Sequence, residues 1–198
     1  MKSLTSVEHA FGSNVIFAST KIDLPERGVV ALRGSNGCGK TTLLKLLGGV
    51  IHSSCGTVRG WRNRFNAVYL DTEYLTLDYL TASELLDMIR PLTGPIPDNG
   101  LLTDGMLATK VSDLSLGQRQ RLILTAALAF QHTDVVLLDE PLNGLDRDGS
   151  KAARSALLAA GQDRLVILAT HEEARWTDYD LTIGQDRKVK LSEAGVAA

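Results

Sequence analysis

The most constraining stretch of this 198-residue chain is a glycine-rich loop that lies between a short apolar run and a leucine-rich segment. Residues 34–42 read Gly-Ser-Asn-Gly-Cys-Gly-Lys-Thr-Thr and match G-x-x-x-x-G-K-[ST] at every fixed position. The apolar run 29–32 predicts a buried parallel strand, and the leucines of 40–47 predict a helix packed on a sheet. Strand, glycine loop and helix in this order are typical of a loop that binds phosphate groups.

The residue types of the loop fit this chemistry. Its three glycines let the backbone turn N–H groups toward phosphate oxygens, and the helix N-terminus adds a partial positive charge. Lys40 is expected to reach the β- and γ-phosphates, while the hydroxyl of Thr41 is expected to bind Mg²⁺. A glycine-rich turn without a ligand is the alternative, which the Lys–Thr pair after a strand disfavours. The residues expected to contact the nucleotide are Gly34, Ser35, Asn36, Gly37, Cys38, Gly39, Lys40, Thr41 and Thr42.

Composition narrows the setting in which this loop works. An apolar content of 44% suits a single domain with a full core. The net charge of −2 gives no indication of a nucleic-acid partner or of an anionic membrane surface. No apolar run approaches the roughly 18 residues of a transmembrane helix, and residues 1–14 lack the apolar centre of a signal peptide. The two cysteines, Cys38 and Cys55, show no metal-ligand spacing and favour a reducing, cytosolic setting.

Alternating strand and helix patterns predict an α/β fold with a mainly parallel sheet. Strands are expected at 4–7, 15–17, 21–24, 29–32, 57–58, 66–70, 135–138 and 165–169, with two more between 180 and 192. Helices are expected at 40–47, from 81 to Pro91, from 115 to about 129, and from about 148 to 160.

Two of these helices begin with a capping-box pattern, in which a Thr or Ser is followed three residues later by Glu or Gln. Thr81 and Glu84 form the first box, and Ser115 and Gln118 form the second. Pro91 is expected to end the earlier helix. The prolines and glycines that follow, up to residue 111, predict a loop with at most a short helix.

A pair of carboxylates follows the strand at 135–138. Asp139 matches the magnesium-holding aspartate of P-loop nucleoside triphosphatases, at the end of a strand where open α/β sheets bind ligands. Glu140 is placed to polarise the attacking water as a general base. Taken alone, the tripeptide Asp-Glu-Pro is equally well explained as a strand-end turn.

Together these motifs resemble the nucleotide-binding subunit of ATP-binding cassette (ABC) transporters over nearly the whole chain. Residues 114–118, Leu-Ser-Leu-Gly-Gln, resemble the family signature Leu-Ser-Gly-Gly-Gln, and residues 142–146 resemble the D-loop. His171 resembles the switch histidine that follows the next strand. Phe11 lies upstream of the glycine loop, where the family usually has a tyrosine that stacks on adenine.

The resemblance implies an ATPase that uses Mg²⁺ and shares its sites between two subunits. Two cassettes pair head to tail, so that the signature of one covers the γ-phosphate bound by the other. The resemblance implies that His171 bonds the γ-phosphate and orients the water. It implies that Phe11 stacks on adenine, with a core aromatic as the alternative. The residues implied to reach the nucleotide of the partner subunit are Ser115, Gly117, Gln118 and Asp146.

Three features depart from the family pattern. Leu116 replaces a signature glycine. The glutamine of the Q-loop, which contacts magnesium or the attacking water, is missing. Thr72 falls at its position and could reach a metal through a bridging water, but the longer and charged Glu73 is the favoured substitute. Thr72 remains the alternative, and the third interpretation is that both are solvated loop residues. The helical subdomain is short.

The sequence therefore predicts a single domain, 1–198, with a P-loop ABC ATPase core, an antiparallel β region near the N-terminus and a small helical subdomain at about 72–129. The expected protein binds ATP and Mg²⁺, dimerises with a second ABC ATPase subunit as a homodimer, and drives an integral-membrane transporter subunit from the cytoplasmic face. Its compact length resembles small bacterial exporter cassettes, including the haem-exporter type of cytochrome c maturation. A non-transport ABC ATPase acting on a nucleic-acid or ribosomal complex is the alternative.

Overall fold

The computed structural model describes residues 2–52, 66–70, 77–171 and 175–195. The strands are β1 (Lys2–Phe11), β2 (Asn14–Leu24), β3 (Gly28–Arg33), β4 (Ala67–Leu70), β5 (Val135–Asp139), β6 (Leu165–Ala169), β7 (Tyr179–Ile183) and β8 (Val189–Glu193). The helices are α1 (Lys40–Leu47), α2 (Ala82–Thr93), α3 (Asp104–Leu107), α4 (Leu116–Ala129) and α5 (Arg147–Gly161). The strand expected at 57–58 lies outside the described residues.

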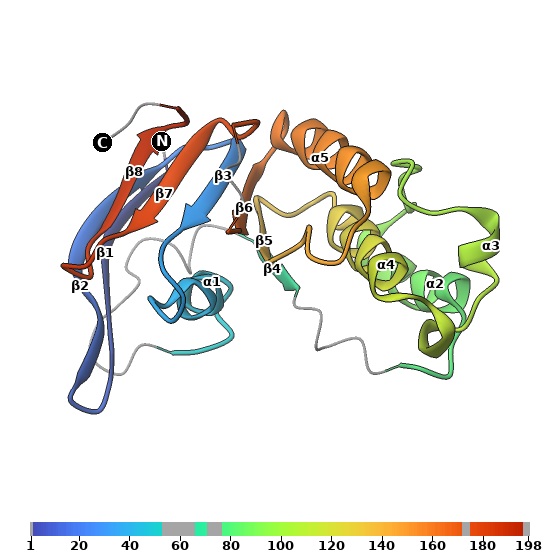
Figure 1. Ribbon diagram of the computed structural model, residues 1–198, viewed down its shortest axis with the longest axis horizontal. Coiled ribbons are helices and arrows are strands. Elements are labelled where there is room, and N and C mark those ends of the chain that lie inside the picture. Colours follow the sequence, from blue (N-terminus) through green and yellow to red (C-terminus); the bar gives the residue numbers. More distant parts are fainter. Residues whose placement is uncertain (1, 53–65, 71–76, 172–174, 196–198) are drawn as a thin grey trace.

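Six of the strands form one sheet in the order β4-β5-β6-β3-β7-β8. All neighbouring pairs are parallel except β7 and β8, which are antiparallel. β1 and β2 form a separate antiparallel hairpin that lies next to β8 (Figure 1). The predicted α/β class, with a mainly parallel sheet and an antiparallel N-terminal region, is confirmed.

The apolar strands are buried because both faces of the sheet are covered. Successive side chains of a strand point to opposite faces, and in β5 this alternation divides the core. Val135 and Leu137 belong to the cluster that contains the leucines of α1 and apolar residues of the hairpin, whereas Val136 and Leu138 belong to the cluster that contains residues of α4 and α5. Figure 1 shows α1 on one face of the sheet and α5 on the other. The central strands are thereby fixed in place, and their carboxyl ends become a rigid platform.

The N-terminal region differs from the three short strands expected there. β2 runs without interruption from Asn14 to Leu24 and pairs with the long β1, whose register shifts at irregular points. Ser19 and Thr20, which separate the two expected strands, do not break β2, because the backbone hydrogen bonds of a hairpin do not depend on side-chain polarity. The turn occurs at Gly12, whose φ of 60° lies in the left-handed region.

Helix α2 also extends further than expected. Pro91 lies inside the helix, which continues to Thr93. A proline near the end of a helix removes one backbone donor, but its fixed φ suits the helix itself. The chain leaves the helix at Gly94, whose φ is 78° and whose N–H bonds the carbonyl of Arg90. The prediction that Pro91 ends the helix is therefore wrong by about half a turn.

The two capping boxes are confirmed. The Thr81 hydroxyl accepts a bond from the Glu84 N–H, and the Glu84 carboxylate accepts one from the Thr81 N–H. Ser115 and Gln118 make the equivalent pair of bonds at the start of α4. Each box satisfies two backbone donors that would otherwise lack partners, so both helix starts are set by local chemistry.

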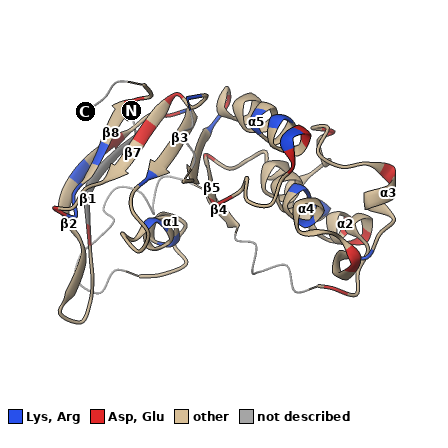
Figure 2. Cartoon of the chain, viewed as in Figure 1, with Lys and Arg blue, Asp and Glu red and all other residues tan. Residues whose placement is uncertain are grey.

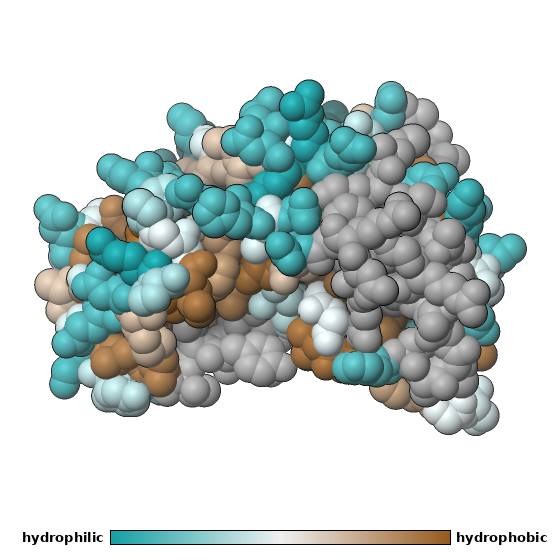
Figure 3. Space-filling model, turned by 180° about the vertical axis from the view of Figure 1, so that it is seen from behind, coloured by the Kyte–Doolittle hydropathy of each residue, from teal (hydrophilic) through white to brown (hydrophobic). Residues whose placement is uncertain are grey.

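A third apolar cluster holds α2 and α3 against Leu122 and Ala126 of α4, away from the hairpin (Figure 1). Apolar side chains also reach the surface of this helical half (Figure 3), where Met88 and Leu92 of α2 are 52% and 74% exposed. Lysine and arginine are interspersed with acidic residues on both halves of the molecule (Figure 2). Among the residues that the structure describes, no helix combines the length and the apolar character needed to cross a bilayer.

Candidate functional site

The glycine loop connects the end of β3 to the start of α1, and its glycines are required by its geometry. Gly37 and Gly39 have φ values of 75° and 106°, which L-residues with side chains rarely adopt. A Cβ on Gly39 would also lie 2.7 Å from Ile16 Cγ2 and 2.9 Å from Phe17 Cζ of β2. The hairpin therefore supports the loop from behind, and only glycine allows this close approach.

Lys40 begins α1 and folds back along the inside of the loop. Its Nζ donates to the Gly34 carbonyl at 3.0 Å and lies 3.4 Å from the Ser35 carbonyl. The residue is only 8% exposed. A buried ammonium group surrounded by inward-turned backbone groups suits a polyanionic ligand, which can replace the carbonyl oxygens as its partner.

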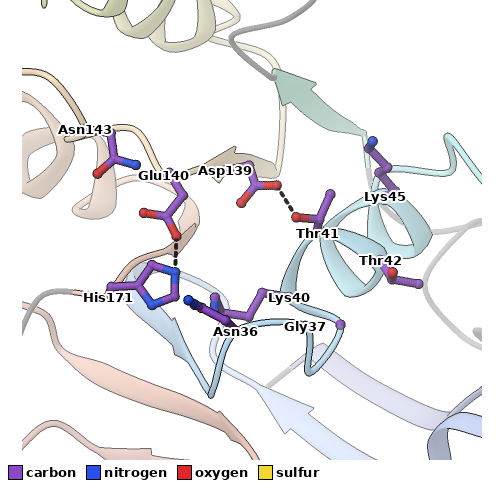
Figure 4. A pocket seen from close by; sticks show the side chains of 11 residues that line it. Asn36, Gly37, Lys40, Thr41, Thr42, Lys45, Asp139, Glu140, Asn143 and His171 are labelled. Carbon is purple, nitrogen blue, oxygen red and sulfur yellow. Dashed lines mark hydrogen bonds and ion pairs between the residues drawn. The ribbon is translucent and has the colours of Figure 1, made fainter.

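Thr41 and Asp139 bring two hard oxygen ligands together. The Thr41 hydroxyl donates to the Asp139 carboxylate at 2.5 Å, although α1 and β5 are far apart in sequence (Figure 4). Mg²⁺ prefers a few such oxygens supplemented by water and phosphate, rather than a complete protein cage. In the part of the chain that the structure describes, no group of three or more His, Cys, Asp or Glu could hold a metal. Thr41 and Asp139 therefore fit a magnesium ion whose coordination shell is completed by phosphate oxygens and water.

Glu140 and His171 lie opposite the loop, at the ends of the adjacent strands β5 and β6. His171 Nε2 lies 2.8 Å from Glu140 Oε1 (Figure 4). The Glu140 backbone has a φ of 51°, and its N–H bonds the Ala169 carbonyl. Such a conformation in a residue other than glycine is strained and is often found at functional sites. Burial raises the pKa of Glu140 above its ordinary value, and the nearby His171 and Lys40 offset this only in part.

These groups surround one cavity of about 710 Å³ (Figure 4). Two of its residues were not expected from the sequence. Lys45 lies one helical turn after Thr41, and Asn143 lies in the segment after Glu140. The (i, i+4) spacing from Thr41 could have indicated Lys45. Asn143 belongs to the segment that resembles the D-loop, but nothing in that resemblance placed its side chain at this cavity. The cavity is lined by Asn36, Gly37, Gly39, Lys40, Thr41, Thr42, Lys45, Asp139, Glu140, Asn143 and His171.

A second hollow, of about 520 Å³, adjoins the other side of the loop. Ser35 and Cys38 line it together with the start of β2 and the turn between β7 and β8. The space above Gly34 is filled by the Cys38 thiol, because a Cβ on Gly34 would lie 2.4 Å from Cys38 Sγ. Gly34 thus allows the loop to turn tightly over the end of β3.

The signature segment lies elsewhere. Ser115 caps α4 and is exposed, and neither it nor Gly117 lines either of these two cavities. Gln118 is engaged in the capping box, and Asp146 caps α5 while its carboxylate accepts from Arg121 at 2.7 Å. Backbone and Arg121 hydrogen bonds lower the pKa of Asp146.

Phe11 ends β1, is 57% exposed, and packs edge-to-face against His9 with ring centroids 4.5 Å apart. It lines neither of the two cavities beside the glycine loop, so its stacking on adenine stays a prediction. Thr72 and Glu73, the two candidates for the missing glutamine, lie outside the described residues.

The arrangement can bind a triphosphate, place a divalent cation beside it and activate a water molecule. The amides and lysine of the loop contact phosphate, the Thr41–Asp139 pair provides metal ligands, and Glu140 supplies a base. A parallel sheet that presents this loop at its carboxyl edge defines a P-loop nucleoside triphosphatase.

Comparisons with known proteins narrow this class. A model of the ABC transporter family matches residues 17–143. The cytochrome c biogenesis ATP-binding export protein CcmA of Novosphingobium aromaticivorans is 36% identical over 166 residues, which cover 81% of this chain and 83% of that protein. The chain therefore belongs to the ABC transporter family of ATP-binding proteins, whose cassettes bind and hydrolyse ATP.

Other relatives are much longer than this chain. The probable ATP-binding protein YheS of Escherichia coli is 30% identical over 94% of this chain, which spans only 30% of YheS. The ATP-binding protein Uup of Caulobacter vibrioides is 36% identical over 84% of this chain, which spans 28% of Uup.

Solved structures agree on the fold. An ATP-binding subunit of an ABC transporter superposes with a TM-score of 0.79, at 19% identity over 96% of this chain and 89% of that one. A dimeric ATP-binding cassette bound to ADP and Pi gives a TM-score of 0.75, at 19% identity over 96% and 97% of the two chains.

Proposed function

We propose that this chain is the ATP-hydrolysing subunit of a transporter whose membrane-spanning part is a separate protein. The observation that carries the proposal is that the nucleotide cavity is incomplete. Lys40, Glu140 and His171 line it, whereas the signature residue Ser115 caps a helix outside it. A second copy is required to bring a signature to the open side of the bound nucleotide.

The chemistry of the signature supports this assembly. The N-terminus of α4, a helix of 14 residues, carries a partial positive charge, and the exposed Ser115 hydroxyl lies at that end. Such a group suits the γ-phosphate held by a partner cassette. One of the structurally similar proteins is itself described as a dimer bound to ADP and Pi. Bound ATP would therefore stabilise the dimer of two copies, and hydrolysis of the ATP would allow the copies to separate.

A magnesium ion is part of the proposed site. Thr41 and Asp139 would hold it, and it would neutralise charge on the phosphates during hydrolysis. Thr72 or Glu73 would take the place of the missing Q-loop glutamine, with Glu73 favoured. In the same proposal, residues of about 72–129 act as the helical subdomain that senses the membrane subunit.

The direction of transport is proposed to be export. Support comes from CcmA, which is named as an export protein and matches this chain over most of both lengths. The protein would work at the cytoplasmic face of the membrane, bound there through its partner. A non-transport ATPase acting on a nucleic-acid or ribosomal complex is the second candidate, since YheS and Uup are named only as ATP-binding proteins and not as transport proteins.

Mixed subunits test the shared sites. Lys40→Ala destroys the glycine loop of one chain, and Ser115→Arg blocks the signature of the other. A mixed dimer then has one site damaged twice and one site intact. We expect each variant alone to be inactive and the mixture to recover up to about a quarter of wild-type turnover, since half of randomly paired dimers are mixed. No recovery, or full activity in wild-type chains that sedimentation shows to be monomeric, would refute the shared site.

Co-purification decides between the two candidate functions. The tagged full chain should carry an integral-membrane protein from detergent-solubilised native membranes when it is trapped as Glu140→Gln with ATP. Recovery of ribosomal particles or nucleic acid in place of a membrane protein would favour the second candidate.

A further inference from the structure

Leu116, which stands where the family signature has glycine, packs against the loop that follows β5. The contact is at Gly144, whose φ is 75°. A Cβ on Gly144 would lie 2.8 Å from Leu116 Cδ2 and 2.9 Å from Leu116 Cγ. The leucine side chain therefore occupies the space directly above this glycine, and a larger residue at 144 would displace it.

Other contacts connect α4 to both ends of the same loop. A Cβ on Gly117 would lie 2.7 Å from the Gly144 carbonyl oxygen, so the backbones themselves approach closely. Gln120 Nε2 lies 3.5 Å from the Glu140 carbonyl, and Arg121 pairs with Asp146 at 2.7 Å. The first two turns of α4 thus contact the loop at its beginning, middle and end.

This loop, residues 140–146, carries part of the nucleotide site. Glu140 and Asn143 both line the 710 Å³ cavity. Asn143 and Gly144 are exposed, and the backbone bonds within the loop are short-range ones, from Asn143 N–H to Glu140 and from Leu145 N–H to Leu142. Glu140 is also held by the bond from its N–H to the Ala169 carbonyl. It is therefore the exposed middle of the loop, at Asn143 and Gly144, that depends on side-chain packing for a fixed position.

The structure assigns to Leu116 the role of a positioning residue for loop 140–146. Its side chain holds Gly144 and so keeps Glu140 and Asn143 at the cavity. Leu116 is 66% exposed, so roughly a third of its surface is buried against its own subunit. Removing a contact of this size should raise the equilibrium constant for local opening of the loop by about a few-fold. This role lies within one subunit and is separate from the contact that the signature makes with a partner's nucleotide.

Hydrogen–deuterium exchange on the nucleotide-free, monomeric chain tests this role without ATP or a dimer. We expect Leu116→Ala to speed amide exchange in residues 140–146 by about two- to fivefold. Exchange in β6 should stay unchanged. Leu92→Ala is the matched control, because Leu92 is an exposed leucine of another helix. Exchange in 140–146 equal to that of Leu92→Ala, or a uniform increase over the whole chain, would overturn the proposal.

A double-variant comparison separates this contact from general damage. Gly144→Ala should also loosen the loop, because the added methyl displaces Leu116 and the left-handed backbone disfavours alanine. In the Leu116→Ala background, the methyl group added by Gly144→Ala has little side chain left to displace. The increases in amide exchange caused by the two substitutions should therefore not multiply in the double variant. Effects that multiply fully would show that the two residues act independently, contrary to the proposal.

Turnover gives the functional readout. Leu116→Ala should lower kcat about two- to fivefold with little change in the KM for ATP, since Lys40 and the glycine loop are untouched. Leu116→Met, whose side chain still reaches Gly144, should restore kcat and slow exchange. The kinetic part rests on the proposed function, and the exchange part does not. A wild-type chain without ATPase activity would refute the function alone, and unchanged exchange would refute the role of Leu116 alone.

Discussion

His171 Nε2 lies 2.8 Å from Glu140 Oε1, and the register of two neighbouring strands sets this distance. Asp139, the last residue of β5, pairs with Ala169, the last residue of β6. Glu140 follows Asp139 directly, and His171 lies two positions after Ala169. The sheet therefore aligns Glu140, the proposed base, with His171 before any ligand binds, which would limit the reorganisation that hydrolysis requires.

Replacing the base should separate binding from hydrolysis. Glu140→Gln keeps the shape and a hydrogen-bonding group but cannot accept the proton of the attacking water. We expect ATP affinity close to that of wild type and turnover lower by roughly 10²-fold or more. Equilibrium binding and steady-state phosphate release measure the two quantities. Turnover within a factor of two of wild type would remove Glu140 from this role.

Replacing Asp139, the proposed metal-binding carboxylate, should make ATP binding insensitive to magnesium. Asp139→Asn leaves the hydrogen bond to Thr41 possible but removes the charge beside the ion. We expect ATP affinity to fall by about tenfold or more with Mg²⁺ present and to change little with EDTA. Asp113→Asn, at an exposed aspartate of the helical half, is the control. Equal losses with and without the metal would contradict the assignment.

Arg164 should matter for stability rather than for turnover. It is buried, and its guanidinium donates to the carbonyls of Phe130 and Leu128 at the end of α4 and contacts the Thr133 hydroxyl. Arg164→Met leaves those acceptors without a partner and should lower the free energy of unfolding by about 2–4 kcal/mol. Arg27→Met is the matched control, since Arg27 is exposed and the bond that it donates to the Gln162 carbonyl is long, at 3.5 Å. If urea titration finds that both variants lose the same free energy of unfolding, Arg164 does not stabilise the fold through its bonds to the carbonyls at the end of α4.

The capping box of α2 should make stability depend on pH. Hydrogen bonds from Thr81 hold the pKa of Glu84 below its ordinary value. A lowered folded-state pKa means that the ionised carboxylate stabilises the fold above its ordinary pKa, and that this stability is lost as the pH falls through the folded pKa. Wild type should therefore exceed Glu84→Gln in its urea midpoint at pH 7, and the gap should narrow as the pH falls below the ordinary pKa of glutamate.

Gln118 shows that a neutral amide can complete such a box, so Glu84→Gln tests the charge rather than the hydrogen bond. Glu193→Gln, at an exposed glutamate of β8, serves as the control. A gap between wild type and Glu84→Gln that persists unchanged at pH 3 would show that ionisation of Glu84 does not contribute.

A thiol reagent should detect ligand binding at the glycine loop. Cys38 is half-buried, lines the 520 Å³ hollow and lies two residues before Lys40, at the N-terminus of α1. A maleimide should block ATPase activity, and ATP should protect against it. Cys38→Ala should be active and resistant. If that variant is inhibited as strongly as wild type, the reactive thiol is Cys55, which lies outside the described residues.

Local chemistry made much of this fold predictable. The bounds of α1, the starts of α2 and α4, and the strand at Leu165–Ala169 follow from apolar spacing and capping residues that lie next to one another in the sequence. The α/β class follows from the alternation of such elements. The continuous β2 strand was missed because its pairing with β1 compensates for polar residues that suggest a break.

The site was predictable only where a motif carries its own context. Lys40 and Thr41 are fixed by the glycine loop, and Asp139 and Glu140 by the end of an apolar strand. Asn143 enters the cavity because of how its loop folds back, which no spacing reveals. The contact of Leu116 with Gly144 likewise depends on two segments whose proximity is set by the packing of α4 against the sheet.

The position of β3 in the sheet has a consequence for how the protein is made. β3 carries the glycine loop, yet its neighbours are β6 and β7, which come from the last third of the chain. During synthesis the ribosome releases β3 long before either neighbour, so the strand has no pairing partner from its own sheet until residues beyond 165 emerge. A loop able to hold ATP is thus among the first parts to be translated and among the last to be completed.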